Sequence, residues 1–255
     1  MNKLLVLVII WGLIFAGCDN GDKPGTPGEP GEPPFTGLTS IDEVTDTLFW
    51  SNDGLMPDDP VELSVKIDAS SELGQLFNAI KLGDKFVALD ISKCYGFPQD
   101  FTFRMENYGD KIVSMILPVG LTITNNSAFI RCTNLKQIIL PEGLITIGDS
   151  TFSGCTSLEK VTIPTSLTRI RGAAFRGCAS LEQIDLPAKL TSIGAQAFDG
   201  CTSLALVICR AATPPTYVSN MLDNTSAALS IKVPTASVAA YKAAWSEYAD
   251  KITAY

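Results

Sequence analysis

The sequence predicts a mainly β solenoid, in which short coils of chain stack on one another around a shared hydrophobic core. Four cysteines recur every 23 residues, at Cys132, Cys155, Cys178 and Cys201. A phenylalanine, a leucine and a proline recur with the same interval around each of them. Repetition at a fixed period of about 20–30 residues is the sequence signature of a solenoid.

Each repeat contains a strand that ends at a proline. An alternation of the type Ile-x-Leu precedes the proline in each of the segments Ile112–Pro118, Leu135–Pro141, Leu158–Pro164 and Leu181–Pro187. This alternation predicts a β-strand with one buried face, and proline ends the strand because it has no N–H for the ladder. The Leu-x-x-Ile segment that follows predicts a second extended side, on which Thr124 stands where later repeats have isoleucine. The Ala/Thr-Phe-x-x-Cys segment predicts a short helical turn.

An N-terminal cap is expected before the repeats, because the first coil of a solenoid would otherwise expose its hydrophobic face. The segment Phe86–Ile91 repeats the strand pattern 26 residues before Ile112 and predicts an irregular first coil. Before it, the sequence predicts a strand over Val61–Ile67 and a helix over Ser71–Lys81. Ser70 or Ser71 is the expected N-cap of that helix.

A C-terminal cap is expected after the repeats end. It begins with a strand over Leu229–Val233 and continues with an amphipathic helix over Ser237–Ala249. An aromatic stripe lies at helical spacing on that helix. Such stripes are more often packed on a core than part of a ligand site, so we interpret this one as core packing. Its members are Val238, Tyr241, Trp245 and Tyr248.

Residues 1–17 have the features of a lipoprotein signal peptide. Lys3 precedes an apolar run over Leu4–Ala16, which is too short to span a bilayer comfortably. The stretch Phe15-Ala16-Gly17-Cys18 resembles a lipobox, which implies that Cys18 is diacylated and becomes the mature N-terminus. Acyl chains would hold the protein at a membrane through about 0.8 kcal/mol per buried methylene. A plain secretory signal with an incidental cysteine is the alternative.

The remaining domain boundaries follow from composition and from the repeat. Residues 18–34 are rich in glycine and proline, which predicts a solvated tether of polyproline character. Residues 35–111 are expected to form the N-terminal cap and irregular first coil, 112–209 the solenoid, and 210–255 the C-terminal cap.

The repeat resembles a known family. Its pattern, Leu-x-x-Ile-x-Leu-Pro-x-x-Leu-x-x-Ile-Gly-x-x-Ala-Phe-x-x-Cys, is similar to the BspA-like, or Treponema-type, leucine-rich repeat. The tail from Val233 to Ile252 is similar to a terminal segment that those proteins often carry. The resemblance covers roughly residues 85–255. It implies a right-handed solenoid with a parallel sheet on its concave side. It also implies a bacterial surface protein, several members of the family being adhesins.

The composition argues against several activities. The chain has no histidine, which removes Ser-His-Asp and Cys-His catalysis and histidine-ligated zinc. No glycine-rich phosphate loop appears, and one cysteine per coil does not make a zinc motif. A formal net charge of −8 without a basic run argues against nucleic acid. We therefore expect no enzyme, no cofactor and no metal site.

The repeat cysteines are interpreted as a ladder of small buried thiols. Disulfides or a metal between neighbouring coils are the alternatives. Adjacent coils would bring the Cα atoms within disulfide range, but stacked side chains point in parallel, which is poor disulfide geometry. Cys94 and Cys209 lie outside the ladder. We interpret each as a buried cap residue, with a disulfide between the two as the alternative.

The outward residues of the strands are the candidate binding site, because solenoids commonly bind along such a face. One ladder consists of Ser114, Gln137, Lys160, Gln183 and Leu206, and the other of Ile116, Ile139, Thr162, Asp185 and Ile208. The isoleucines are more apolar than solubility requires, which fits a protein contact. The alternative is that β-branched residues were chosen there because they pair well across strands.

These features predict a membrane-anchored extracytoplasmic binding module at the cell surface or outer membrane. It would dock a protein or other macromolecule, of a host matrix or a microbial surface, on its concave strand face. The alternative is a structural or envelope-spacing lipoprotein with no specific ligand, facing the periplasm.

Overall fold

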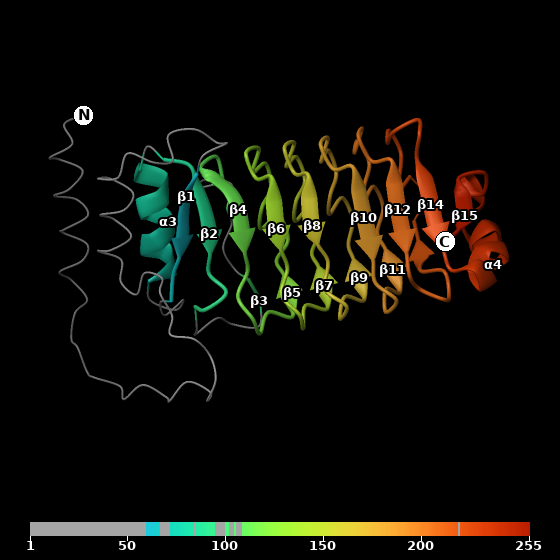
Figure 1. Cartoon of the computed structure of the whole chain (residues 1–255), viewed down its shortest axis with the longest axis horizontal. Coiled ribbons are helices and arrows are strands. Elements are labelled where there is room, and N and C mark those ends of the chain that lie inside the picture. Colours follow the sequence, from blue (N-terminus) through green and yellow to red (C-terminus); the bar gives the residue numbers. More distant parts are fainter. Residues whose placement is uncertain are drawn as a thin grey trace, which may run out of the picture. The chain divides into compact units, whose positions relative to one another are not determined.

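Parallel strands from successive coils stack in sequence order along the solenoid (Figure 1). The computed structural model describes residues 60–66, 72–83, 85–94, 100–101, 105, 109–218 and 220–255. All of these belong to one compact unit, Gly37–Tyr255. The signal peptide and tether predicted for residues 1–34, Cys18 included, lie outside the described residues.

The described strands form three parallel sheets. The first contains β1 (Val61–Ser64), β2 (Val87–Asp90), β4 (Ile112–Ile116), β6 (Gln137–Ile139) and β8 (Lys160–Thr162), in that order. The second contains β10 (Gln183–Leu186), β12 (Leu206–Cys209), β14 (Ser230–Val233) and β15 (Ile252–Ala254). The third contains β3 (Asp100–Phe101), β5 (Ile123–Thr124), β7 (Thr146–Ile147), β9 (Arg169–Ile170), β11 (Ser192–Ile193) and β13 (Thr216–Tyr217).

The two sides of each repeat are confirmed as strands. The longer strands alternate between buried and less buried residues, as in β10, where Ile184 and Leu186 face the core. The Leu-x-x-Ile segments form the two-residue strands of the third sheet. The segment predicted as a short helical turn contains turns and no helix in the described repeats. The backbone enters the left-handed region twice per coil here, just before the segment at Ser127, Ser150, Ala173 and Gln196, and within it at Arg131, Gly154, Gly177 and Gly200.

Stacked phenylalanines run through the core from coil to coil. The ring centroids of Phe129 and Phe152 lie 5.2 Å apart, as do those of Phe152 and Phe175, and the Phe175–Phe198 distance is 5.4 Å. Beside them, each thiol of the later repeats donates to a phenylalanine carbonyl oxygen of the coil before. The Sγ–O distances are 3.0 Å for Cys155, 3.2 Å for Cys178 and 3.1 Å for Cys201.

The N-terminal cap agrees in outline with the expectation. Helix α3 covers Leu73–Leu82, and its N-cap is Glu72 rather than Ser70 or Ser71, which lie outside the described residues. Strand β1 ends at Ser64, short of the predicted Ile67. Strand β2 pairs with β4 through an irregular register at Val87.

The C-terminal helix is shorter than predicted. In place of one helix over Ser237–Ala249, a 3₁₀ turn η2 (Thr235–Ser237) precedes helix α4 (Val238–Ala244), and a second 3₁₀ turn, η3 (Ser246–Tyr248), follows. Trp245 leaves the helix with φ −109° and ψ 55°. Its indole Nε1 donates to the Pro215 carbonyl oxygen at 3.0 Å, so burial of the ring interrupts the helix.

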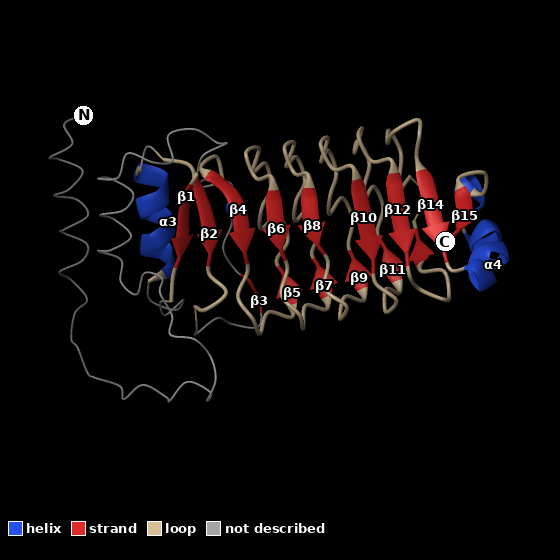
Figure 2. Ribbon diagram, in the orientation of Figure 1, coloured by secondary structure: helices blue, strands red, loops and turns tan. Residues whose placement is uncertain are grey.

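The aromatic stripe packs on the core as expected. Tyr241 and Trp245 are fully buried, Tyr248 is 7% exposed, and Val238 packs against the core cluster. In the described part of the chain, α3 and α4 stand at opposite ends of the strand array (Figure 2). Both ends of the solenoid core are therefore covered by helical segments.

Candidate functional site

The ten predicted site residues occupy the outward positions of β4, β6, β8, β10 and β12, which we call the strand face. Lys160, Thr162, Gln183 and Asp185 are exposed, and Ser114, Ile116, Gln137, Ile139, Leu206 and Ile208 are partly buried. Strand register aligns Ser114 with Gln137 and Lys160, and Ile116 with Ile139 and Thr162. It also aligns Gln183 with Leu206, and Asp185 with Ile208.

The two ladders are not continuous, which corrects the sequence prediction. Among the described residues no strand pairing joins β8 to β10, so each ladder breaks there. Lys160 and Thr162 therefore belong to the first sheet, and Gln183 and Asp185 to the second. The wider space between these strands is visible in Figure 1.

The face extends further than the sequence analysis placed it. At the N-terminal side, Ala88 and Asp90 align with Ser114 and Ile116. At the C-terminal side, Lys232 aligns with Ile208. The same period-2 alternation occurs in Phe86–Ile91 and Leu229–Val233, which the sequence analysis places in the caps. Their alternation was the signal that could have found these residues.

A groove of about 350 Å³ lies across the beginnings of β4, β6 and β8. Its lining residues come from three coils and from the segment before β1; they are Pro60, Val113, Ser114, Lys136, Gln137, Glu159 and Lys160. Three of them, Ser114, Gln137 and Lys160, were predicted as site residues. The lining mixes two ammonium groups with one carboxylate, so the groove suits polar groups of either charge.

Asp185 forms an ion pair with a neighbouring residue on the strand face. Arg210, directly after β12, donates from Nε and Nη2 to the two carboxylate oxygens of Asp185 at 2.7 and 2.6 Å. This hydrogen bonding with Asp185 raises the pKa of the Arg210 guanidinium. The pair is exposed and presents a carboxylate already matched by a cation. A partner would meet a planar ion pair here rather than a lone negative charge.

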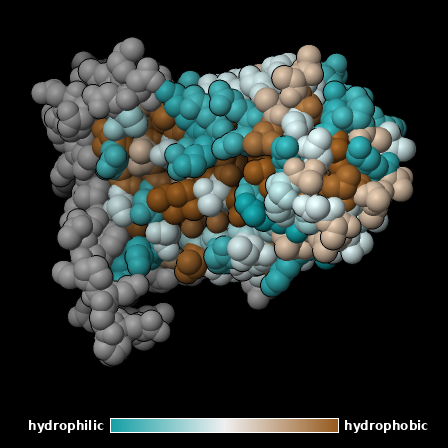
Figure 3. Space-filling model, turned by 45° about the vertical axis from the view of Figure 1, so that its right-hand side comes forward, coloured by the Kyte–Doolittle hydropathy of each residue, from teal (hydrophilic) through white to brown (hydrophobic). Residues whose placement is uncertain are grey.

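Apolar side chains lie at the centre of the first sheet's outward surface. Ile116 and Ile139 are register neighbours and both are partly exposed. In the view of Figure 3, hydrophobic residues form a band along the solenoid, bordered on both sides by hydrophilic residues. An apolar centre with a polar rim is the usual arrangement of a protein–protein contact surface.

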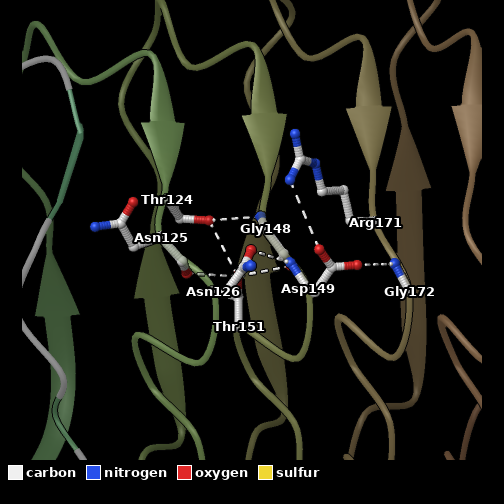
Figure 4. Close-up of polar contacts among 8 residues, drawn as sticks. All are labelled: Thr124, Asn125, Asn126, Gly148, Asp149, Thr151, Arg171 and Gly172. Atoms are coloured by element: carbon white, nitrogen blue, oxygen red, sulfur yellow. Dashed lines mark hydrogen bonds and ion pairs between the residues drawn. The ribbon is translucent and has the colours of Figure 1, made fainter.

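Polar side chains also brace the coils to one another at the ends of the short strands (Figure 4). Asn126 Oδ1 accepts the backbone N–H of Asp149 at 2.9 Å. One coil further, Asp149 Oδ1 accepts the N–H of Gly172 at 3.0 Å, while Arg171 lies 3.6 Å from the other carboxylate oxygen. These contacts are structural, because each side chain meets the backbone of the next coil.

The described cysteines offer no accessible thiolate. All six are buried free thiols. Burial raises the pKa of the Cys178 thiol well above its usual value, and raises that of Cys209 as well. Cys94 bonds the Val65 carbonyl oxygen, whereas Cys209 lies 3.1 Å from the Tyr241 hydroxyl at the other end of the solenoid. No cluster of metal-ligating side chains occurs among the described residues.

Parallel strands stacked in order, an unbroken core and capped ends define a leucine-rich repeat solenoid. The sequence model of the family described as "BspA type Leucine rich repeat region" matches residues 105–228 in six copies. Residues 105–228 are therefore similar to the repeats of the BspA-type leucine-rich repeat family. Proteins of this family are typically non-enzymatic binding modules, which makes this chain a candidate for protein interaction.

Several solved structures resemble the chain. A leucine-rich repeat protein of T. pallidum is 31% identical over 48% of this chain and 59% of its own, with a TM-score of 0.43. A leucine-rich cell surface protein from Faecalibacterium prausnitzii is 21% identical, covers 69% of this chain and 55% of its own, and has a TM-score of 0.45. The pneumococcal vaccine antigen PcpA is 16% identical, covers 75% of this chain and 52% of its own, and has a TM-score of 0.46.

This chain thus spans between about half and three fifths of the length of these proteins. A comparison with curated proteins gives no match. Within the described residues, no helix has the length and apolar character needed to cross a membrane.

Proposed function

We infer that the protein is a surface-anchored binding module that docks a macromolecule, a protein of a host matrix or of another microbial surface, on its strand face. The observation that carries this proposal is the alignment of partly exposed Ile116 and Ile139 beside exposed Lys160 and Thr162 on adjoining strands. An apolar centre supplies binding free energy when it is buried, and the polar rim supplies orientation.

The anchor belongs to the same proposal. The lipobox-like stretch ending at Cys18 supports attachment of the mature chain to a membrane, and residues 18–34 would then separate the solenoid from the lipid surface. A domain held in this way has its strand face available to large partners. Many copies on one surface would add avidity to a modest single contact.

The experiment uses cells that produce the full chain and tests their adhesion to plates coated with extracted host matrix. The double variant Ile139→Glu/Lys160→Glu places two carboxylates on the strand face. We expect adhesion to fall by at least about tenfold, because a charge in the centre of a contact must be desolvated without a partner. Protease shaving of the same cells measures how much of the protein is exposed outside.

A matched control places the same two changes on the other sheet. Ile123 on β5 and Arg169 on β9 are both exposed, so Ile123→Glu/Arg169→Glu has the same chemistry away from the strand face. Adhesion should stay at the wild-type value. If wild-type cells adhere no better than cells without the protein, and shaving leaves it intact, the envelope-spacing alternative holds instead.

A further inference from the structure

The strand face is open at one step between coils, which we call the β8–β10 seam. At the steps on either side, a backbone N–H at the start of a strand donates to the coil before. Lys160 N bonds Lys136 O at 3.1 Å, and Leu206 N bonds Glu182 O at 3.3 Å. In this described region the equivalent bond from Gln183 to Glu159 is missing. Both strands thus present backbone donors and acceptors to the seam.

The same two coils remain closed elsewhere. On the third sheet β9 pairs with β11 in regular register. The rings of Phe175 and Phe198, which belong to these coils, stack at 5.4 Å with an interplanar angle of 2°. The opening is therefore confined to the strand face, and the core behind it stays packed.

Apolar side chains that point inward are uncovered at the seam. Val161 and Ile163 are only partly buried. The counterparts of Val161 on the neighbouring coils are closed, since Ile138 is 0% exposed and Ile184 is 2% exposed, and so are those of Ile163, Leu140 at 3% and Leu186 at 0%. The seam thus combines a strip of apolar surface with two strand edges.

Two residues of like charge stand at the entrance of this step. Glu159 and Glu182 are exposed and occupy the same position on neighbouring coils, 23 residues apart. Like charges directly opposite each other destabilise a strand pair. One coil earlier that position holds Lys136, which faces Glu159 with opposite charge, and there β6 and β8 pair normally.

We propose that the β8–β10 seam binds an extended apolar segment of a protein, with a basic residue of that segment placed between Glu159 and Glu182. This deepens the proposed function, on which it rests for the existence of a protein partner. Cα atoms of β8 and β10 approach within 8 Å of each other, so the two strands move apart when the segment's backbone bonds one of their edges, in the manner of strand addition. Its apolar side chains cover Val161 and Ile163, and its cation relieves the repulsion between the two carboxylates.

The opening itself is tested by cysteine labelling of the full chain. Val161→Cys and Ile163→Cys are compared with Ile138→Cys and Ile184→Cys, and labelling at each site is read by peptide mass spectrometry. We expect the seam positions to label at least about tenfold faster, because a covered thiol reacts only after local opening. The native thiols of Cys155 and Cys178 serve as buried references in every sample. Equal rates at all four positions would overturn the proposal.

The ligand chemistry is tested with a synthetic peptide of residues 135–141, which has an apolar alternation and a lysine at the required position. We expect it to slow labelling of the Val161→Cys variant at least about threefold at saturation. Two control peptides test the backbone hydrogen bonds and the cation separately. One has alternate backbone nitrogens methylated, and the other has its lysine replaced by glutamate. Neither should protect. No protection by the parent peptide, or equal protection by all three peptides, would overturn the proposal.

These outcomes are independent of cell adhesion. Adhesion can depend on Ile139 and Lys160 while the labelling shows a closed seam, in which case the proposed function stands and the seam proposal falls. Peptide protection without any effect of the Ile139→Glu/Lys160→Glu variant on adhesion gives the opposite result. A partner would then bind at the seam without the matrix adhesion that we infer.

Discussion

The thiol of Cys178 donates a hydrogen bond to the backbone carbonyl oxygen of Phe152, one coil earlier, across an Sγ–O distance of 3.2 Å. The same relationship joins Cys155 to Phe129 and Cys201 to Phe175. A cysteine is small enough to stack and still carries a donor. The repeated cysteine thus adds a second, inter-coil hydrogen bond to a carbonyl oxygen that already accepts a backbone N–H within its own coil, as Phe152 O accepts that of Cys155 at 3.1 Å.

These buried thiols make stability depend on pH. Burial raises the pKa of Cys178 above the value of about 8.5 that a thiol has in an unfolded chain. Below that pH both states are protonated and the free energy of unfolding is constant. Above it only the unfolded state loses the proton. The free energy of unfolding then falls by up to about 1.4 kcal/mol per pH unit for each such thiol.

Urea unfolding between neutral and alkaline pH measures this slope. The Cys178→Ser variant keeps a hydroxyl donor for the Phe152 carbonyl oxygen but does not titrate in this range. We expect its alkaline slope to be shallower than that of the wild type by one thiol's contribution, about 1.4 kcal/mol per pH unit. Identical slopes would mean that Cys178 ionises as easily in the folded protein as in the unfolded chain.

The architecture could be predicted from the sequence because the coils of the solenoid repeat one pattern of residues. Every coil places leucine, isoleucine, phenylalanine and cysteine at the same positions, so side chains meet their own kind one coil along. Deviations from the pattern were harder to interpret. Thr124 stands where later coils have isoleucine, and Thr151 where they have alanine. In the structure their hydroxyl oxygens lie 3.1 Å apart and both are buried. Only the fold shows that these two deviations compensate each other.

The candidate face was predicted in its positions but not in its continuity. Strand alternation assigned all ten outward residues correctly, because side-chain direction follows the period of the backbone. The break between Lys160 and Gln183 is a relationship between two coils whose equivalent residues are 23 apart in the sequence. The pairing of Asp185 with Arg210 likewise joins residues on separate coils. Neither relationship follows from one strand considered alone.

Close packing of the short strands should make Gly194 intolerant of any side chain. A Cβ atom there would lie 2.4 Å from Gly172 N and 2.6 Å from Arg171 C, so backbone would have to move. We expect Gly194→Ala to lower the free energy of unfolding by about 2–3 kcal/mol in urea titration. Gly74, in α3, has nothing within 4 Å of its Cβ position. Gly74→Ala should raise stability by about 0.5–1 kcal/mol. Equal effects at both glycines would contradict this packing.

Two substitutions of Asp149 distinguish the stability contributed by its hydrogen bond from that contributed by its ion pair. Asp149→Ala removes the acceptor for the Gly172 N–H and should cost about 0.5–1.5 kcal/mol. Asp149→Asn keeps an oxygen acceptor, as Asn126 does one coil earlier, and loses only the Arg171 ion pair, in which both side chains are 49% exposed. Because exposed pairs contribute little, thermal or urea unfolding should place this variant near the wild type. If Asp149→Asn lowered the free energy of unfolding more than Asp149→Ala, the stability would come from the charge of Asp149.

The proposed lipid anchor predicts a simple biochemical result. Wild-type protein made in cells fed radiolabelled palmitate should carry the label and sediment with membranes. Cys18→Ser removes the thiol that would be acylated, so the label should disappear and the protein should no longer be retained by acyl chains. If the label persisted in this variant, acylation would occur at another residue. If the unlabelled variant still sedimented with membranes, another part of the chain would attach it.

Reversing one charge should close the β8–β10 seam. In Glu182→Lys the new ammonium faces Glu159, as Lys136 faces Glu159 one coil earlier. An opposite-charge pair across neighbouring strands contributes about 0.2–1 kcal/mol, so urea unfolding should show a gain of that size. Labelling of the Val161→Cys thiol should slow in the same background. The control is Glu62→Lys, an exposed glutamate on β1, at the opposite edge of the first sheet from β8. If it slows labelling equally, net charge rather than repulsion between Glu159 and Glu182 governs access to the seam.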